Sequence, residues 1–320
     1  MKKILITGVA GFLGSHLVKD LLNRGFYVIG IDNLSTGKLS NIKNEIDNHY
    51  FEFIKHDVVD KNIVNHPSLC DVGEIYHLAS PASPKFYQAD PLGTIAVNTI
   101  GTQNMLELAK KNDAKILFAS TSEVYGDPLV HPQPESYRGN VNTWGPRACY
   151  DEAKRLGEVY CYEYYQKYNV QAKVVRIFNT YSAGLRNDDG RVISNFVTQA
   201  LQNKDITVYG DGKQTRSFCY VDDTIRALEL VMEKDKTTGE IINIGNPKEY
   251  SILEVAQMVK RLSESSSKIT FHPLPKDDPK VRRPVIDKAI KLLGWEPKID
   301  LEEGLIKTIK VYKEKVLSLQ

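Results

Sequence analysis

ILITGVAGFLGSH (residues 4–16) is the stretch that decides the fold. Its short apolar run ends before Gly8, and Gly11 and Gly14 follow at three-residue steps. Apolar residues then continue at helical spacing from Phe12. This pattern predicts a strand, a tight turn and a helix. Because such a turn lets backbone N–H groups at the positive end of a helix approach a phosphate pair, the stretch predicts a dinucleotide site.

An acidic residue follows at the spacing that this site requires. The apolar run at residues 27–31 predicts a second strand, and it ends at Asp32. A carboxylate there accepts hydrogen bonds from the adenosine ribose hydroxyls and repels a 2′-phosphate. Asp32 therefore favours NAD over NADP as the cofactor. The alternative is a strand-end aspartate that only caps the next turn.

Composition limits the remaining possibilities. The 320 residues include 42 basic and 40 acidic side chains, so no attraction to nucleic acid or to a membrane surface is indicated. Four cysteines (Cys70, Cys149, Cys161 and Cys219) show no metal-ligand spacing and are interpreted as reduced thiols of a cytoplasmic protein. No apolar stretch approaches the length of a membrane span. We expect no metal site.

Strand and helix patterns alternate through the first half of the chain. Further strands are expected at 51–54, 74–78, 115–119 and 174–178, and helices at about 91–111 and 150–168. This order predicts an α/β fold with a doubly wound parallel sheet of the Rossmann type. We expect residues 1–178, with a returning segment at about 217–246, to form the cofactor domain. Residues 179–216 and 247–320 would form a smaller substrate-binding lobe.

Tyr150 and Lys154 are the first candidates for catalysis. They stand four residues apart in CYDEAKR (residues 149–155), which places both on one face of a helix. A nearby ammonium group and a positive nicotinamide ring would lower the tyrosine pKa from about 10. The phenolate could then take a proton from a substrate hydroxyl as hydride leaves. An exposed helix pair is the alternative.

A second cluster follows the fifth strand, at STSEVYG (residues 120–126). The Thr121 hydroxyl can bond the same substrate hydroxyl, and Glu123 adds a carboxylate near the reacting carbons. The alternatives are a strand-end turn for Thr121 and Ser122, and a capping role for Glu123.

Together these features resemble the extended short-chain dehydrogenase/reductase family of nucleotide-sugar enzymes, and within it the UDP-glucuronate decarboxylases, or UDP-xylose synthases. The resemblance covers nearly the whole chain. It rests on HLASPASP (77–84), ASTSEVYGDP (119–128), GPRACYDEAKR (145–155), RIFNTY (176–181), NDDGRVISNF (187–196), TVYGDGKQTRSFCYVDD (207–223), DDPKVRRP (277–284) and LGWEPKIDLEEGL (293–305).

The resemblance implies a redox-neutral cycle. Tyr150 would deprotonate the sugar C4 hydroxyl while hydride passes from C4 to NAD. The C4 ketone would make loss of the C5 carboxylate easy, and protonation at C5 with return of hydride would give UDP-xylose. By the same resemblance, Thr121 binds the reacting hydroxyl and Glu123 lies beside C4 and C5. Lys154 orients the nicotinamide ribose, and Arg282 lies at the substrate end.

The resemblance also implies two sets of binding residues. Besides Tyr150 and Lys154, the cofactor set is Gly8, Gly11, Phe12, Leu13, Gly14, Asp32, Asn33, Ser35, Thr36, Gly37, Asp57, Val58, Leu78, Ala79 and Ser80. The set for the UDP-sugar substrate is Ser122, Asn179, Arg191, Asn195, Tyr209, Gln214, Arg216 and Arg282. The chain departs from the family at residues 182–186, where a Gly-Pro-Arg turn is usual and Arg186 is a candidate replacement. Arg283 is the alternative to Arg282.

Rival functions remain open at this point. A 4,6-dehydratase needs an acid where this chain has Ser122, whose hydroxyl is unsuited to that role. A 4-ketoreductase or 4-epimerase would need only Thr121, Tyr150 and Lys154. A non-catalytic NAD-binding sensor would tend to lose the tyrosine or the lysine. The helix at 150–168 is apolar around much of its circumference, which implies burial on more than one side. The resemblance implies a homodimer whose four-helix interface is built from this helix and the helix at 91–111.

Overall fold

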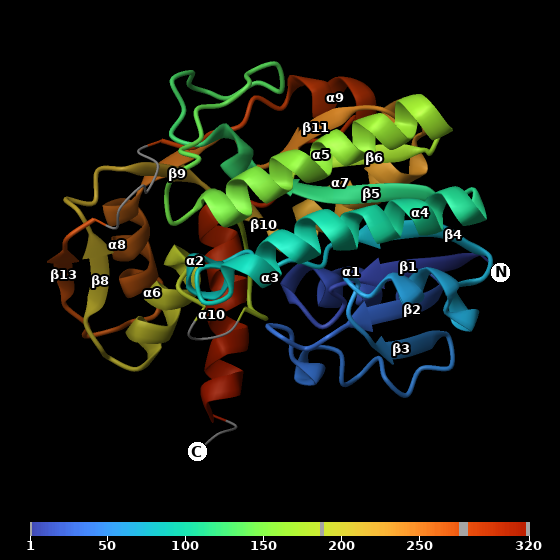
Figure 1. The fold of residues 1–320 in the computed structure, drawn as a ribbon. Coiled ribbons are helices and arrows are strands. Elements are labelled where there is room, and N and C mark those ends of the chain that lie inside the picture. The colour runs from blue at the N-terminus through green and yellow to red at the C-terminus, as the bar shows by residue number, and fades with distance from the viewer. Residues whose placement is uncertain (1, 186–188, 275–280, 318–320) are drawn as a thin grey trace.

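The computed structural model describes residues 2–185, 189–274 and 281–317, without the side chains of 315–317. Its centre is a seven-stranded sheet in which every pairing is parallel, ordered β11-β6-β5-β4-β1-β2-β3 (Figure 1). The strands are β1 (Lys3–Thr7), β2 (Tyr27–Asp32), β3 (Phe51–Lys55), β4 (Val72–His77), β5 (Lys115–Thr121), β6 (Ala172–Ile177) and β11 (Ile241–Ile244). The doubly wound parallel sheet predicted from the sequence is confirmed.

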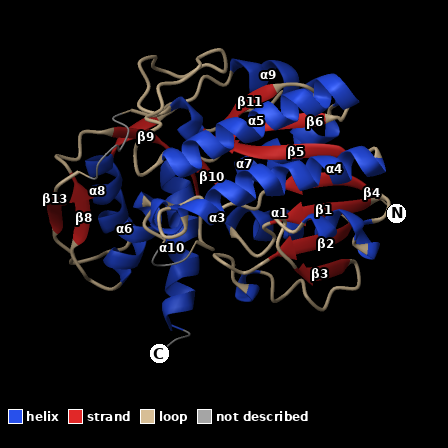
Figure 2. Cartoon of the chain, in the orientation of Figure 1, coloured by secondary structure: helices blue, strands red, loops and turns tan. Residues whose placement is uncertain are grey.

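Helices cover both faces of this sheet, as Figures 1 and 2 show. One face carries α1 (Phe12–Asn23) and α7 (Val221–Glu233), and the other carries α4 (Thr102–Asn112) and α5 (Ala148–Tyr168). Successive strand residues supply the two cores: Ile4 and Ile6 pack with α1, whereas Leu5 packs with α4. This alternation follows from the two-residue period of a strand.

The helix expected at 91–111 is divided into three parts. It consists of α3 (Pro91–Ala96), a π-helical turn at Val97–Gly101, and α4. Asn98 donates to the carbonyl of Thr94 at 2.8 Å, and Thr99 donates to that of Ile95 at 2.7 Å. These side chains compete with the backbone for helical carbonyls, which accounts for the local change of helix type.

The remaining elements lie mostly to one side of the sheet, beyond the carboxyl ends of its strands. They form three two-stranded sheets, β7–β10, β9–β12 and β8–β13. Their bounds are α2 (Pro84–Tyr87), β7 (Thr180–Tyr181), α6 (Val192–Leu201), β8 (Ile206–Tyr209), β9 (Thr215–Ser217), β10 (Cys219–Tyr220), β12 (Glu249–Ser251), α8 (Ile252–Leu262), β13 (Ile269–His272), α9 (Asp287–Leu293) and α10 (Leu301–Leu317). Short 3-10 turns occupy Leu39–Asn41, Lys61–Asn65, Pro67–Leu69, Ser122–Tyr125 and Asp235–Thr237.

Segment 217–246 contributes α7 and β11, and β11 pairs with β6. Contacts from later in the chain hold α7 in place. The Trp295 indole donates to the carbonyl of Asp223 at 3.0 Å, and the Asp223 carboxylate accepts the N–H groups of Lys298 and Ile299. Among the helices in the part of the chain described, none has the length and apolar character to cross a bilayer.

Candidate active site

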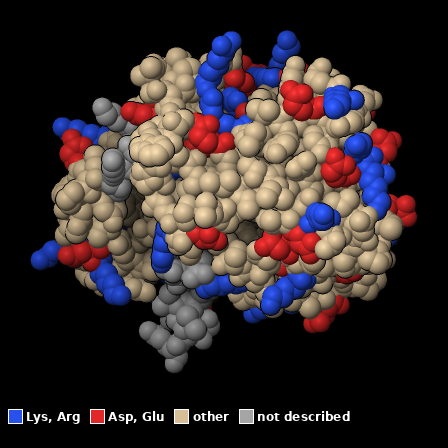
Figure 3. All heavy atoms as spheres, in the orientation of Figure 1, with Lys and Arg blue, Asp and Glu red and all other residues tan. Residues whose placement is uncertain are grey.

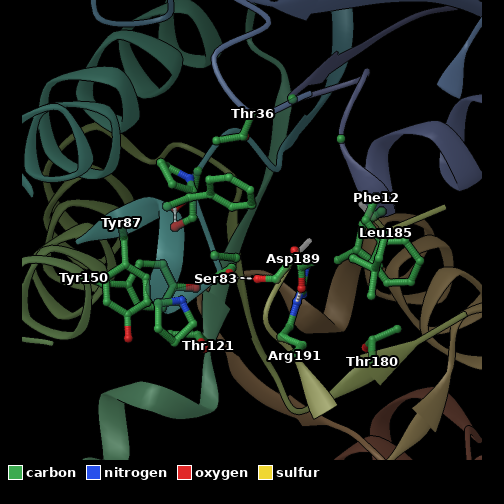
Figure 4. Close-up of a pocket in the computed structure, with 18 of the residues that line it drawn as sticks. Phe12, Thr36, Ser83, Tyr87, Thr121, Tyr150, Thr180, Leu185, Asp189 and Arg191 are labelled. Atoms are coloured by element: carbon green, nitrogen blue, oxygen red, sulfur yellow. Dashed lines mark hydrogen bonds and ion pairs between the residues drawn. The ribbon is translucent and has the colours of Figure 1, made fainter. Parts of the chain in front are cut away.

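The predicted site residues line one cavity of about 780 Å³. It opens beyond the carboxyl ends of the sheet strands, and Figure 4 shows part of its wall. Every residue predicted to bind the cofactor, to bind the substrate or to act in catalysis lines it. The structure therefore brings together residues that lie as far apart in the chain as Gly8 and Arg282.

Three glycines shape the cavity floor at the start of α1. Gly8 has φ of +72°, and a Cβ there would lie 2.9 Å from the backbone of Ala79. A Cβ on Gly14 would overlap the carbonyl of Gly8. The predicted turn therefore needs glycine both for its backbone conformation and for its packing. The absence of side chains here leaves the helix N-terminus open to the cavity, as a bound diphosphate requires.

Asp32 lies at the end of β2 with its carboxylate held by the backbone. One oxygen accepts the N–H of Ala10 at 3.0 Å, and the other accepts that of Leu34 at 2.7 Å. The contact with Leu34 is the turn-capping role considered as the alternative. Asp32 also lines the cavity, and a carboxylate has lone pairs left for further donors. The geometry thus allows the predicted ribose contact beside the capping role.

Tyr150 stands near the amino end of α5 and faces the end of β5. The side chain of Thr121, the last residue of β5, interacts with Tyr150 and lowers its pKa. The Tyr87 ring stacks on the Tyr150 ring, with centroids 5.0 Å apart and 5° between planes (Figure 4). Thr121 also accepts the N–H of Glu123 at 3.2 Å, so the strand-end turn considered as its alternative role is present as well.

Lys154 lies one turn further along α5 and is buried. Its ammonium group donates to the carbonyl of Ala119 at 2.7 Å, and burial lowers its pKa to about 7. Burial is also the largest influence on the pKa of Tyr150 and raises it. The interaction with Thr121 lowers this pKa, but by less. In the polypeptide by itself the pKa of Tyr150 is therefore raised rather than lowered, because desolvation of the phenolate dominates. The expected lowering by Lys154 together with a bound nicotinamide stays a prediction.

Glu123 lies between two guanidinium groups. Its carboxylate forms an ion pair with Arg147 and lies 3.6 Å from a terminal nitrogen of Arg282. Burial alone would raise its pKa, but the charges of Arg282, Arg147 and Arg216 hold the pKa at about 2. Glu123 is therefore ionised at neutral pH, and it does not act as the capping residue considered as its alternative role.

Arg282 rather than Arg283 lines the cavity. The Arg282 side chain is 1% exposed and donates to the carbonyls of Ser122 and Gly126, the latter at 2.7 Å. Arg283 instead lies 3.6 Å from Glu249. Arg186, the candidate replacement for the family's usual arginine, lies outside the described residues, and Gly184 occupies the middle of that loop with φ of +107°.

The sequence matches the family described as GDP-mannose 4,6 dehydratase over residues 5–308. The UDP-glucuronic acid decarboxylase 1 of Danio rerio is 51% identical over 98% of this chain and 73% of that protein.

The chain belongs to this family of extended short-chain dehydrogenases/reductases. Solved structures of other such enzymes share its fold. UDP-glucose 4-epimerase from Thermotoga maritima, solved with UDP-glucose, has a TM-score of 0.91 and 31% identity, covering 98% of this chain and 99% of that one. A UDP-glucuronic acid 4-epimerase from Bacillus cereus, solved with a fluorinated UDP-glucuronic acid and NAD, has a TM-score of 0.88 and 32% identity over 98% and 99% of the two chains.

Several residues that line the cavity were not predicted, among them Ser83, Tyr87, Arg147 and Asp189. Asp189 forms an ion pair with Arg191, whose terminal nitrogen is 2.9 Å from the carboxylate, and its carbonyl accepts from Ser83 (Figure 4). Ser83 and Arg147 lie within motifs that the resemblance used, so those motifs carried a signal for them. Asp189 likewise lies within NDDGRVISNF (187–196), whereas Tyr87 acts through a contact that sequence spacing does not reveal.

Proposed function

We propose that this protein is a UDP-glucuronate decarboxylase that converts UDP-glucuronate to UDP-xylose and carbon dioxide without net oxidation or reduction. The observation that carries the proposal is the position of Glu123, Arg147 and Arg282. This cluster lines the same cavity as the Thr121–Tyr150 pair and the glycine cradle. A relative half identical over nearly the whole chain is a UDP-glucuronic acid decarboxylase, which supports the assignment.

The cavity residues fit NAD as the cofactor. Gly8, Gly11 and Gly14 would accept the diphosphate at the N-terminus of α1, and the Asp32 carboxylate would accept the ribose hydroxyls. Lys154, beside Tyr150, would orient the nicotinamide ribose. When bound, NAD accepts a hydride from sugar C4 and later returns it to the same carbon.

Tyr150 and Thr121 carry the proton transfer. Because both side chains line the cavity and Thr121 interacts with Tyr150, a C4 hydroxyl placed beside them can donate its proton to the Tyr150 oxygen while Thr121 holds it in position. Burial disfavours a free phenolate in the polypeptide alone, which favours transfer of the proton together with the oxidation of C4.

The C4 ketone lies β to the C5 carboxylate, so the carbon–carbon bond can break with its electrons entering an enolate. The protonated Tyr150 hydroxyl can donate a hydrogen bond to the enolate oxygen. Glu123 is held ionised by its arginine neighbours, so it cannot donate the proton that C5 then needs. We assign that proton to water, and Tyr150 returns its own proton to the C4 oxygen when C4 is reduced again. Glu123 then has an electrostatic and positioning role.

A second lobe completes the substrate site in this proposal. We propose that residues 1–178 and 217–246 form the NAD domain, and that 179–216 and 247–320 bind the nucleotide. Two arginines of this second lobe, Arg191 and Arg216, line the cavity, and guanidinium groups of this kind bind diphosphates through paired hydrogen bonds. We expect uridine and diphosphate contacts from Asn179, Arg191, Asn195, Tyr209, Gln214 and Arg216.

A 4-epimerase is the second candidate, because two solved epimerases share the fold at TM-scores near 0.9. The site disfavours a 4,6-dehydratase, since Ser122 and the ionised Glu123 offer no acid to expel the C6 hydroxyl.

The test is incubation of purified protein and NAD with UDP-glucuronate. We expect UDP-pentose by mass spectrometry, release of carbon dioxide and no accumulation of NADH absorbance. A product of unchanged mass that is a stereoisomer at C4 would instead identify an epimerase. Consumption of a 4-keto sugar nucleotide together with NADH would identify a ketoreductase.

We also propose a homodimer. Exposed apolar side chains lie on neighbouring helices of one face: Leu92, Ile95 and Ile100 on α3 and the adjoining π-helical turn, and Leu156, Val159 and Tyr162 on α5. Figure 3 shows mostly uncharged atoms in this central area. Pairing of two such faces would bury them in a four-helix contact. Sedimentation at micromolar concentration should give a dimer, and a monomer alone would contradict it.

The four free thiols support the predicted cytoplasmic location.

A further inference from the structure

Arg147 is the more exposed of the two arginines that flank Glu123. Its side chain is 15% exposed and that of Glu123 is 19% exposed, whereas the Arg282 side chain is 1% exposed. All three residues line the cavity. A ligand that enters this end of the cavity therefore meets the Glu123–Arg147 pair before it meets Arg282.

The Arg147 side chain is not used to start α5. Arg147 is the residue before the helix, and its side chain makes no capping hydrogen bond there. It reaches instead across to Glu123 on the turn that follows β5. The ion pair thus joins the segment that carries Thr121 to the helix that carries Tyr150.

Charge balance gives this pair a consequence for substrate choice. Among these three residues, Glu123 contributes one negative charge and Arg147 and Arg282 contribute two positive charges, so the cluster carries one net positive charge. The charge of Arg216 acts on Glu123 more weakly than that of either arginine. Asp151 adds little negative charge at neutral pH, because burial and the charge of Glu123 raise its pKa to about 8. Without Arg147 the cluster would be neutral, with the Glu123 carboxylate facing any negative group on the sugar.

We propose that Arg147 is a specificity-determining residue, which neutralises Glu123 and gives the sugar end of the cavity the positive charge that a substrate carboxylate requires. This inference rests on the proposed function, since it assumes a uronate substrate. It assigns to Arg147 a part in discriminating a uronate from a neutral hexose.

The test measures binding, so that turnover does not interfere. In a Tyr150→Phe background with NAD, calorimetry would compare UDP-glucuronate, UDP-glucose and UDP. We expect Arg147→Met to weaken the binding of UDP-glucuronate roughly 10- to 100-fold, as for loss of a charged hydrogen bond. The same variant should weaken the binding of UDP-glucose and of UDP by less than about threefold. Arg147→Lys, which keeps the charge, should retain affinity for UDP-glucuronate within about tenfold. Arg261→Met, at an exposed ion pair with Glu302, is the matched control and should change none of the three.

A double variant separates charge balance from simple structural damage. Adding Glu123→Gln to Arg147→Met restores one net positive charge to the cluster, so we expect affinity for UDP-glucuronate to recover to within about fivefold of the Tyr150→Phe parent. A merely structural Arg147 would give no such recovery. Equal weakening of all three ligands by Arg147→Met, or no weakening of any, would overturn the inference.

Binding to the Tyr150→Phe parent distinguishes a failure of the proposed decarboxylase function from a failure of the role proposed for Arg147. If Tyr150→Phe binds UDP-glucose at least as tightly as UDP-glucuronate, the decarboxylase assignment itself fails. If the parent prefers UDP-glucuronate and Arg147→Met keeps that preference, only the role of Arg147 fails.

Discussion

The ring of Tyr87 lies parallel to the ring of Tyr150, with centroids 5.0 Å apart and an interplanar angle of 5°. Tyr87 comes from the short helix α2, and Tyr150 from α5, more than sixty residues later. Tyr87 is 1% exposed, and its hydroxyl has no hydrogen-bond partner among the described residues. The contact between the two residues is thus one of ring packing, and it limits the orientations open to the tyrosine that we propose as the base.

Tyr87→Ala should therefore reduce turnover more than substrate binding. Removal of the ring leaves a void beside Tyr150, and misplacement of a catalytic group by about 1 Å is enough to slow a reaction about 100-fold. We expect kcat for carbon dioxide release to fall roughly 10- to 100-fold.

Tyr87→Phe is the matched control, because it keeps the stacked ring and removes only the unpartnered hydroxyl. It should retain kcat within about threefold. An equal loss in both variants would show that the hydroxyl, and not the stacking, is what matters.

Gly14→Ala should abolish tight NAD binding. A Cβ at this position would overlap the carbonyl of Gly8 and lie 2.7 Å from the Cα of Val9, so the start of α1 would have to move. We expect NAD affinity, measured by fluorescence titration, to fall more than about tenfold, with a loss of stability of about 1–3 kcal/mol.

Gly73→Ala provides the comparison for this variant. Its Cβ would meet only the flexible side chain of Lys2, at 3.2 Å. NAD affinity should stay unchanged there. Normal NAD binding by Gly14→Ala would contradict the assignment of the glycine turn as the diphosphate cradle.

Asp32→Asn should narrow the preference for NAD over NADP. The amide loses the negative charge that repels a 2′-phosphate, and its nitrogen cannot accept the second of the two backbone N–H groups now bound. We expect NAD affinity to fall roughly tenfold and the NAD/NADP affinity ratio to shrink by more than that. An unchanged ratio would assign Asp32 to turn capping alone.

Short-range patterns in the sequence predicted the glycine turn and helix α5. The glycine turn and α5 are encoded by short-range spacing, because a tight turn and a helix face each involve residues only a few positions apart. Glu123 was found for the same reason, since it follows the end of a strand. Ring stacking of Tyr87 on Tyr150 and pairing of Arg147 with Glu123 depend on the packing of distant segments, which spacing does not contain.

The strand within the predicted returning segment 217–246 and the pKa of Tyr150 escaped prediction for physical reasons. β11 is four residues long and pairs with β6 far earlier in the chain, so that this segment adds a strand becomes visible only in the sheet. The tyrosine pKa was expected to respond to Lys154, but burial is the larger influence, and the extent of burial is a property of the folded chain.

Asp151→Asn should stabilise the protein at neutral and alkaline pH. Asp151 is 5% exposed, and one of its carboxylate oxygens is buried without a hydrogen-bond partner in the described part of the chain. Burial, with the charge of Glu123, raises its pKa from 3.8 to about 8. Between these values the unfolded chain releases the proton while the folded chain keeps it, so the folded state binds more protons and stability falls as pH rises.

Asparagine cannot ionise, so the Asp151→Asn variant does not lose stability in this way as the pH rises. The difference in unfolding free energy between variant and wild type should be near zero at about pH 4 and should grow by at most about 1.4 kcal/mol per pH unit up to about pH 8. Thermal unfolding across this range would show a Tm gain of a few degrees near pH 8. Asp211→Asn, with a side chain that is 65% exposed, is the matched control and should show no such trend. A constant difference at every pH would mean that the Asp151 carboxyl is ionised in the folded state, and the buried charge would then have to be balanced by Arg147 or Arg282.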